Sequence, residues 1–148
     1  MDCKYCDFLK HVRLPDGMQS VGRVNGADVL LLIDGKHPGR CVLVSPWHVR
    51  ELFDLLPTQR SEFLEAVSCL ANAVSTVCAA DKVNIAFYGD LSDHLHAHVV
   101  PKWHDGPCWG DAFNLQPTIA EQPSAGRFNN LSWADVNENL RRLIHGIN

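Results

Sequence analysis

The stretch HLHAHVVPKW, residues 94–103, places three histidines at alternate positions with apolar residues between them. In an extended strand, residues two apart lie on the same face, about 6 to 7 Å from one another. We therefore predict a strand over residues 94–101 that ends at Pro101, because proline has no N–H for the ladder. The three imidazoles would form a polar row, and the core would receive Leu95, Ala97 and Val99.

The rest of the chain predicts an antiparallel sheet with helices. Apolar runs bounded by turn residues predict further strands at residues 21–25, 29–34, 40–45 and 83–90. Between them, apolar residues recur every three or four positions, which indicates one amphipathic helix over residues 58–79 with Thr58 as its N-cap. A short helix is expected over residues 132–144, capped by Ser132. The sum is an α+β fold with four or five antiparallel strands, one long helix and a short C-terminal helix.

The composition limits the classes of protein to consider. A chain of 148 residues with 46% hydrophobic residues predicts a single domain, residues 1–148. The sequence has no apolar run long enough for a membrane span and no signal-peptide core at its start, so we expect a cytoplasmic protein without a membrane partner. A net charge of −4 without clustered Lys and Arg argues against a nucleic-acid partner.

The histidine row itself leaves two chemistries open, metal coordination and nucleophilic attack by neutral imidazole. An exposed strand face that carries histidine without a role is the plain alternative. The six cysteines are too few for a disulfide scaffold. Cys3 and Cys6 form the one close pair, and such a pair is either half of a metal site or two unconnected small residues.

HLHAHVVP resembles the signature of the histidine triad family, in which three alternating histidines precede apolar residues. VLLLIDGKHPGRCVLVSPWH, residues 29–48, is similar to the family's strand, turn, strand and Pro-x-x-His block, and NIAFYGD matches as well. The resemblance covers residues 3–109, which makes them the expected core and residues 110–148 an extension. DGPCWGDAF is similar to the ends of a bacterial branch of small stand-alone members.

The resemblance implies a nucleotide hydrolase or nucleotidyl transferase that cleaves phosphoanhydride or phosphoramidate bonds at the α-phosphate. His96 matches the nucleophile, which would form a covalent nucleotidyl-histidine intermediate. Its other ring nitrogen should donate to a backbone carbonyl. His98 matches the histidine that hydrogen-bonds the phosphate and the bridging oxygen. Small members also pair as homodimers, so a homodimer is expected.

In some branches of the superfamily a cysteine pair, the Pro-x-x-His histidine and the first triad histidine surround zinc. The matching positions here are Cys3, Cys6, His48 and His94. Two thiolates and two imidazoles complete a tetrahedron, so this set describes structural zinc with no position for a catalytic water.

The nucleotide contacts are less determined. Asp34 matches a ribose-binding position, or serves only as a turn former, and Leu32 would pack on the base. Lys102 would bind phosphate, or is a solvated surface lysine. The connection before the triad is short and acidic, with Asp90 and Asp93, which would repel a polyphosphate.

Two further classes of function stay open from the sequence. The first is a zinc-stabilised nucleotide-binding or interaction module with little turnover. The second is a metallohydrolase in which all three triad histidines bind the metal.

Overall fold

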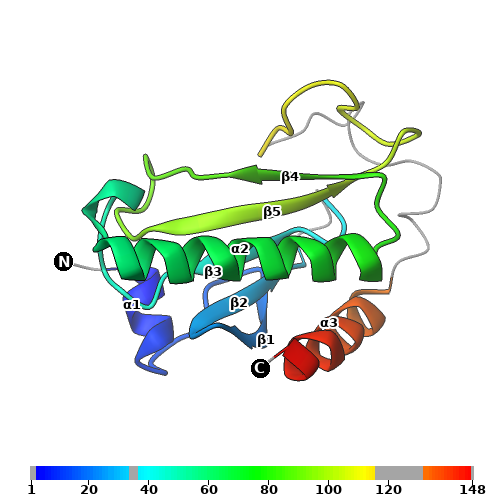
Figure 1. The fold of residues 1–148 in the computed structure, drawn as a ribbon. Helices are drawn as coiled ribbons and strands as arrows, with labels where there is room; N and C mark the ends of the chain where they lie inside the picture. Colours follow the sequence, from blue (N-terminus) through cyan, green and yellow to red (C-terminus); the bar gives the residue numbers. More distant parts are fainter. Residues whose placement is uncertain (1–2, 34–36, 116–131, 148) are drawn as a thin grey trace.

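The architecture is a five-stranded antiparallel sheet with helices on both faces, shown in Figure 1. The computed structural model describes residues 3–33, 37–115 and 132–147. Across the sheet the strand order is β1 (Met18–Val24), β2 (Ala27–Leu32), β3 (Cys41–Val44), β5 (His96–Lys102) and β4 (Lys82–Ala86). The helices are α1 (Lys4–Leu9), the 3₁₀ turn η1 (Leu52–Asp54), α2 (Pro57–Val77) and α3 (Trp133–Ile147). The α+β class expected from the sequence is confirmed.

The two faces of the sheet carry different layers because strand residues alternate between them. Val29, Leu31 and Leu43 pack with α2 and α3 in the larger core. The long helix α2 runs across this face, with α3 beside it (Figure 1). Leu30, Leu32, Val42 and Val44 face the other way and pack with Tyr5 of α1. The opposite face therefore has a small cover, and part of it stays open for a site.

Helix α1 was not predicted, because six residues are too few for a periodic pattern. Cys3 caps it, since the Cys3 Sγ accepts a hydrogen bond from the Cys6 backbone N–H at 3.4 Å. The predicted cap of α2 was wrong: Leu56 is the N-cap and Thr58 lies inside the first turn. Pro57 explains the difference, because its fixed φ suits the first helical position. The Ser132 cap of α3 is confirmed by its Oγ, which accepts from the Asp135 N–H at 3.4 Å.

Strand boundaries around the triad also differ from the prediction. The strand β4 ends at Ala86, well before residue 90, and β5 begins at His96 and continues through Pro101. Pro101 is tolerated because β3 pairs with β5 only as far as Cys41 with Val99. Beyond that pair, among the described strands, β5 pairs only with β4. The side of β5 that faced β3 therefore needs no backbone N–H donor at Pro101.

Leu95, Ala97 and Val99 are buried in the larger core, as predicted. The six cysteines are unbridged. Within the described residues, no helix is both long and apolar enough to cross a membrane. Residues 116–131, in the expected C-terminal extension, lie outside the described part of the chain.

Gly39 is the backbone position where a side chain should be most harmful. Its φ is +80°, and a Cβ there would lie 2.6 Å from the Cys78 Sγ and 3.0 Å from the Pro101 Cγ. Gly26 is a matched control, with the same φ of +80° and open space around it. We expect Gly39→Ala to lower the free energy of unfolding by about 1 to 3 kcal/mol more than Gly26→Ala, measured by urea denaturation. Equal costs would show that the contact with Cys78 is not tight.

Candidate active site and metal centre

The three triad histidines share one face of the segment that leads into β5, but they serve two different groups of residues. All three are buried, with exposed fractions of 1% for His94, 6% for His96 and 7% for His98. His96 and His98 line one cavity, and their ring centroids are 5.1 Å apart. His94 precedes the strand and turns toward two cysteines. The row predicted from the sequence is therefore divided between two sites.

His96 is held in its neutral form. Its Nδ1–H donates to the His94 backbone carbonyl at 2.7 Å. Because that bond places the proton on Nδ1, the lone pair is on Nε2. Burial lowers the pKa of His96 below its ordinary value, and the hydrogen bond to the carbonyl opposes this only in part. At neutral pH the ring is unprotonated and can attack an electrophile.

His98 is more strongly biased toward the neutral form. Burial lowers its pKa to about 3, and the charges of Arg40 and Lys4 and the neighbouring His96 add to the effect. Its Nδ1 is buried and has no hydrogen-bond partner within the described residues. A buried polar atom without a partner beside a cavity is a group that a ligand can satisfy.

Aromatic side chains form one wall of the cavity, whose volume is about 520 Å³. Tyr88 lies 5.5 Å from the ring of His98, and Phe113 lies 5.9 Å from Tyr88. Tyr5 packs against His96 with a centroid separation of 4.9 Å. A planar ligand could stack on such a wall. The sequence analysis missed these residues, because an aromatic residue in a loop, such as Tyr88 or Phe113, or in a helix as short as α1, carries no pattern that separates a ligand wall from a core.

Charged residues also reach this cavity. Lys4 and Arg40 supply two cations and Asp90 supplies one carboxylate. Of these three, only Asp90 was noted from the sequence. Arg40 lies directly before β3. The register in which β3 pairs with β5 therefore determines whether the Arg40 side chain lies near His96 and His98.

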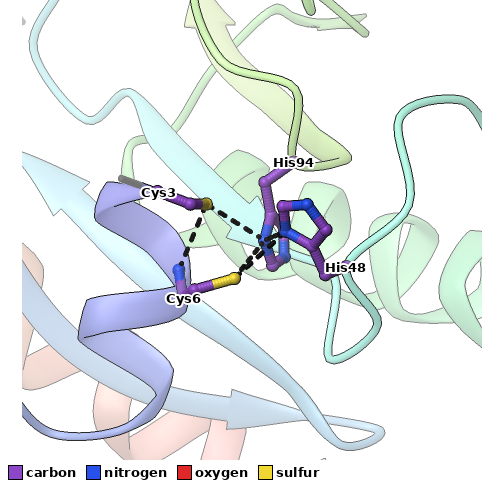
Figure 2. A group of neighbouring side chains, drawn as sticks. All are labelled: Cys3, Cys6, His48 and His94. Atoms are coloured by element: carbon purple, nitrogen blue, oxygen red, sulfur yellow. Dashed lines mark hydrogen bonds between the residues drawn. The ribbon is translucent and has the colours of Figure 1, made fainter. Parts of the chain in front are cut away.

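Cys3, Cys6, His48 and His94 form a compact cluster, shown in Figure 2. Their potential ligand atoms all lie within 4.8 Å of one another. The Cys6 Sγ is 3.1 Å from the His48 Nδ1 and 3.5 Å from the His94 Nδ1, and the two Nδ1 atoms are 3.2 Å apart. The residues come from α1, from the loop after β3 and from the approach to β5. Four donors that converge from three segments could hold one metal ion.

The proton on His94 is also placed as a metal ligand requires. The His94 Nε2–H donates to the Ser45 backbone carbonyl at 2.8 Å, which leaves the Nδ1 lone pair directed at the cluster. Such a bond to the second ring nitrogen fixes the orientation of a ligating imidazole. Burial lowers the pKa of His94, and the Ser45 bond opposes that shift.

The residues predicted to contact the nucleotide are not brought together at the cavity by the described structure. Asp34 lies outside the described residues. Leu32 is buried in the smaller core with Met18, and Leu32 is not among the described residues that line the cavity. Lys102 is neither solvated nor beside the triad. It is 6% exposed and donates to the backbone carbonyls of Cys108 and Asp111.

The low pKa of His98 predicts acid sensitivity. The unfolded chain takes up a proton on this residue near pH 6.5, but the folded chain does so only near pH 3. The free energy of unfolding should therefore fall by about 2 kcal/mol between pH 7.5 and 5.0 on account of His98. Urea denaturation of His98→Gln should lack this share of the loss. Identical pH profiles for the two proteins would contradict the neutral state of His98.

Comparisons with known proteins bear on this geometry. No protein-family profile matches the chain, and no curated protein matches it. Solved structures do. A histidine triad protein from Marinobacter aquaeolei VT8 is 25% identical, with a TM-score of 0.68, covering 89% of this chain and 92% of its own. One from Bradyrhizobium japonicum is 26% identical, with a TM-score of 0.64, covering 89% and 97%. A zinc-bound histidine triad family protein from Mycobacterium smegmatis is 18% identical, with a TM-score of 0.67, covering 99% and 96%.

The fold and the site together define an α+β domain that presents a neutral histidine pair to a cavity at one sheet face. The alternating histidines and the matched structures agree on its family. The chain has the fold of solved histidine triad proteins and carries alternating histidines like those of that family's signature, as its sequence resemblance indicated.

Proposed function

We propose that this protein is a hydrolase or transferase of nucleotide conjugates that cleaves phosphoanhydride or phosphoramidate bonds at the α-phosphate. The observation that carries the proposal is the bond from the His96 Nδ1–H to the His94 carbonyl, which leaves the Nε2 lone pair available for attack. The aromatic wall of Tyr88 and Phe113 suits a nucleobase, and His98 offers an unsatisfied nitrogen to the phosphoryl group.

The reaction proceeds in two displacements at phosphorus. In the first, the His96 Nε2 lone pair forms a bond to the α-phosphorus, and the bond to the leaving group breaks with its electron pair. Neutral His98 hydrogen-bonds the bridging atom, where negative charge develops, and the departing leaving group takes a proton from solvent. In the second, water or another acceptor attacks phosphorus and loses its proton to solvent, and the P–Nε2 bond breaks with its electron pair returning to Nε2, which restores neutral His96.

We assign zinc to the Cys3, Cys6, His48 and His94 cluster. A tetrahedral ion with Zn–S of about 2.3 Å and Zn–N of about 2.05 Å separates sulfur from nitrogen by about 3.6 Å and two nitrogens by about 3.3 Å. His94 Nδ1 lies 3.6 Å from Cys3 Sγ and 3.5 Å from Cys6 Sγ, and the two imidazoles lie 3.2 Å apart, which agrees with these values. The Cys6 Sγ is closer to His48 Nδ1, at 3.1 Å, so binding an ion would move these two groups apart. Four protein ligands leave no place for water, so the ion is structural. When bound, it fastens α1 to the approach of β5.

The alternative metal site, with all three triad histidines as ligands, has no support in this geometry. The His94 Nδ1 faces the cysteines and its Nε2–H donates to the Ser45 carbonyl, so neither ring nitrogen of His94 is left for a site shared with His96 and His98. Catalysis is therefore assigned to His96 and structure to the cluster.

Trapping the intermediate tests the proposal. The protein is mixed with nucleoside phosphoramidates, dinucleoside polyphosphates and nucleotidyl sugars, quenched within milliseconds to seconds, and analysed by intact mass and peptide mapping. An acid-labile, base-stable nucleotidyl adduct on His96 is expected. A chain that binds nucleotides but gives neither adduct nor turnover with any donor would instead be the zinc-stabilised binding module.

The exposed edge of the sheet supports a homodimer. The strand β4 is the last in the sheet, and Ile85 and the following Phe87 are 46% and 40% exposed. Within the described part of the chain no further strand pairs with β4, and an edge strand with exposed apolar side chains is a suitable surface for pairing with a second copy. Light scattering should give twice the 16.5 kDa of one chain, and Ile85→Lys should give a single chain. Leu14→Lys, at an exposed position between α1 and β1, is the matched control, and a monomeric wild type would contradict the proposal.

A further inference from the structure

Arg40 places a buried guanidinium in the wall of the cavity beside the triad. Its exposed fraction is 7%, and it lines the same cavity as His96 and His98. The backbone of Arg40 is fixed on both sides, since its N–H donates to the His37 carbonyl at 3.0 Å and its carbonyl accepts from the Leu32 N–H at 2.9 Å. The Cα atom from which the Arg40 side chain extends is therefore held in place by backbone hydrogen bonds.

The strand register explains why this arginine meets the triad. Val42 of β3 is paired with His98 of β5, and Val44 is paired with His96. Arg40 is two residues before Val42, so it lies on the same face of the sheet in the next row. The guanidinium and the two imidazoles thus share one face and one cavity.

The triad does not itself supply positive charge. The His96 Nδ1–H donates to the His94 carbonyl and leaves the attacking Nε2 with a lone pair, and burial keeps the pKa of His98 near 3, so neither ring brings a positive charge to the cavity. A phosphoryl group under attack is anionic, and charge builds on its oxygens in the transition state. The compensating charge must come from neighbours. A guanidinium is charged at every physiological pH and can bind two phosphate oxygens at once.

Lys4 is a second cation at the mouth of the cavity. It is exposed, and its Nζ lies 4.9 Å from the centre of the Tyr5 ring. Against these two cations, the described lining residues include one carboxylate, Asp90. The charges of these described lining residues match a single phosphoryl group better than a polyphosphate chain.

We propose that Arg40 is a catalytic residue that binds the non-bridging oxygens of the phosphoryl group attacked by His96, with Lys4 as an auxiliary cation. The substrates this favours are nucleoside monophosphoryl conjugates with a leaving group that is not itself a polyphosphate. The inference rests on the proposed function for its kinetic part, and its binding part can be tested separately.

The test combines binding and kinetics in the full-length, metal-loaded protein. Calorimetry measures the affinity of the four nucleoside 5′-monophosphates and of the four matching nucleosides for the wild type, Arg40→Gln, Arg40→Lys and Lys4→Gln. Arg13→Gln, an exposed arginine between α1 and β1, is the matched control. Arg40→Gln should weaken monophosphate binding at least about 10-fold and lower kcat/KM about 10²- to 10³-fold, with nucleoside binding unchanged. Arg40→Lys should retain part of the monophosphate affinity and part of kcat/KM. Lys4→Gln should lose less of each quantity than Arg40→Gln.

The outcomes separate this inference from the proposed function. If the wild type turns over substrate and Arg40→Gln matches it within about twofold, the inference is wrong and the function stands. Equal weakening of monophosphate and nucleoside binding by Arg40→Gln would mean a structural role and would also overturn the inference. If monophosphate binding depends on Arg40 but the wild type gives no turnover and no His96 adduct, the phosphate-binding role stands and the enzymatic function fails.

Discussion

His96→Asn should abolish turnover while leaving nucleotide binding in place. Asparagine offers no nucleophilic ring nitrogen, although its amide can still donate to the His94 carbonyl that now accepts from the His96 Nδ1 at 2.7 Å. Loss of the nucleophile in covalent catalysis costs on the order of 10⁴-fold or more in kcat. The affinity for a nucleoside monophosphate should change only a few-fold, because Arg40, His98 and the aromatic wall remain. Steady-state kinetics and calorimetry on the same preparation measure both quantities.

His11→Asn is the matched control for this variant. His11 is exposed at the end of α1 and has a φ of +58°, which asparagine tolerates well. Its kcat should equal that of the wild type. If His96→Asn kept a tenth of the wild-type rate, the attacking group would have to be something other than His96, and water activated in the cavity would become the leading mechanism.

His96 and the strand that carries it could be predicted because the information is local. Alternating histidines and apolar residues specify both an extended backbone and its buried face within eight residues. The cluster residues could be named by resemblance, but their meeting is a tertiary event, since Cys3 and His94 are 91 residues apart.

Other features could not be seen in the sequence for physical reasons. Whether Arg40 reaches the triad depends on the pairing of Val42 with His98, and register between distant strands has no local signal. Pro101 was expected to end β5, but its tolerance depends on where β3 stops. Lys102 shares the triad face by alternation, yet its ammonium turns away to the Cys108 and Asp111 carbonyls, which only the folded chain brings near.

Cys6→Ser should remove the metal and much of the stability. A structural zinc ion contributes its binding energy to folding, because the unfolded chain holds no preformed site. One ion at this cluster would join α1, the loop with His48 and the approach to β5. We expect metal content to fall from one equivalent to below about 0.1, and the free energy of unfolding to fall by more than about 3 kcal/mol. Metal analysis and urea denaturation measure the two effects.

Cys69→Ser controls for the loss of a thiol, because Cys69 is a half-buried cysteine of α2 whose Sγ contacts Glu65 outside the cluster. That variant should keep the metal. Retention of metal by Cys6→Ser would point instead to a tri-histidine site and would overturn the assignment of His94 to the thiolate cluster.

The metal variant should also slow catalysis, although no cluster atom needs to contact substrate. The His94 imidazole is a cluster member, but its carbonyl fixes the proton of His96. Tyr5 stands between the two cysteines and packs 4.9 Å from the His96 ring. Losing the ion releases both supports at once, so kcat should drop about 10- to 100-fold, the range seen when the groups that orient a reactive site are removed. An unchanged kcat in the metal-free protein would mean that β5 alone orients the nucleophile.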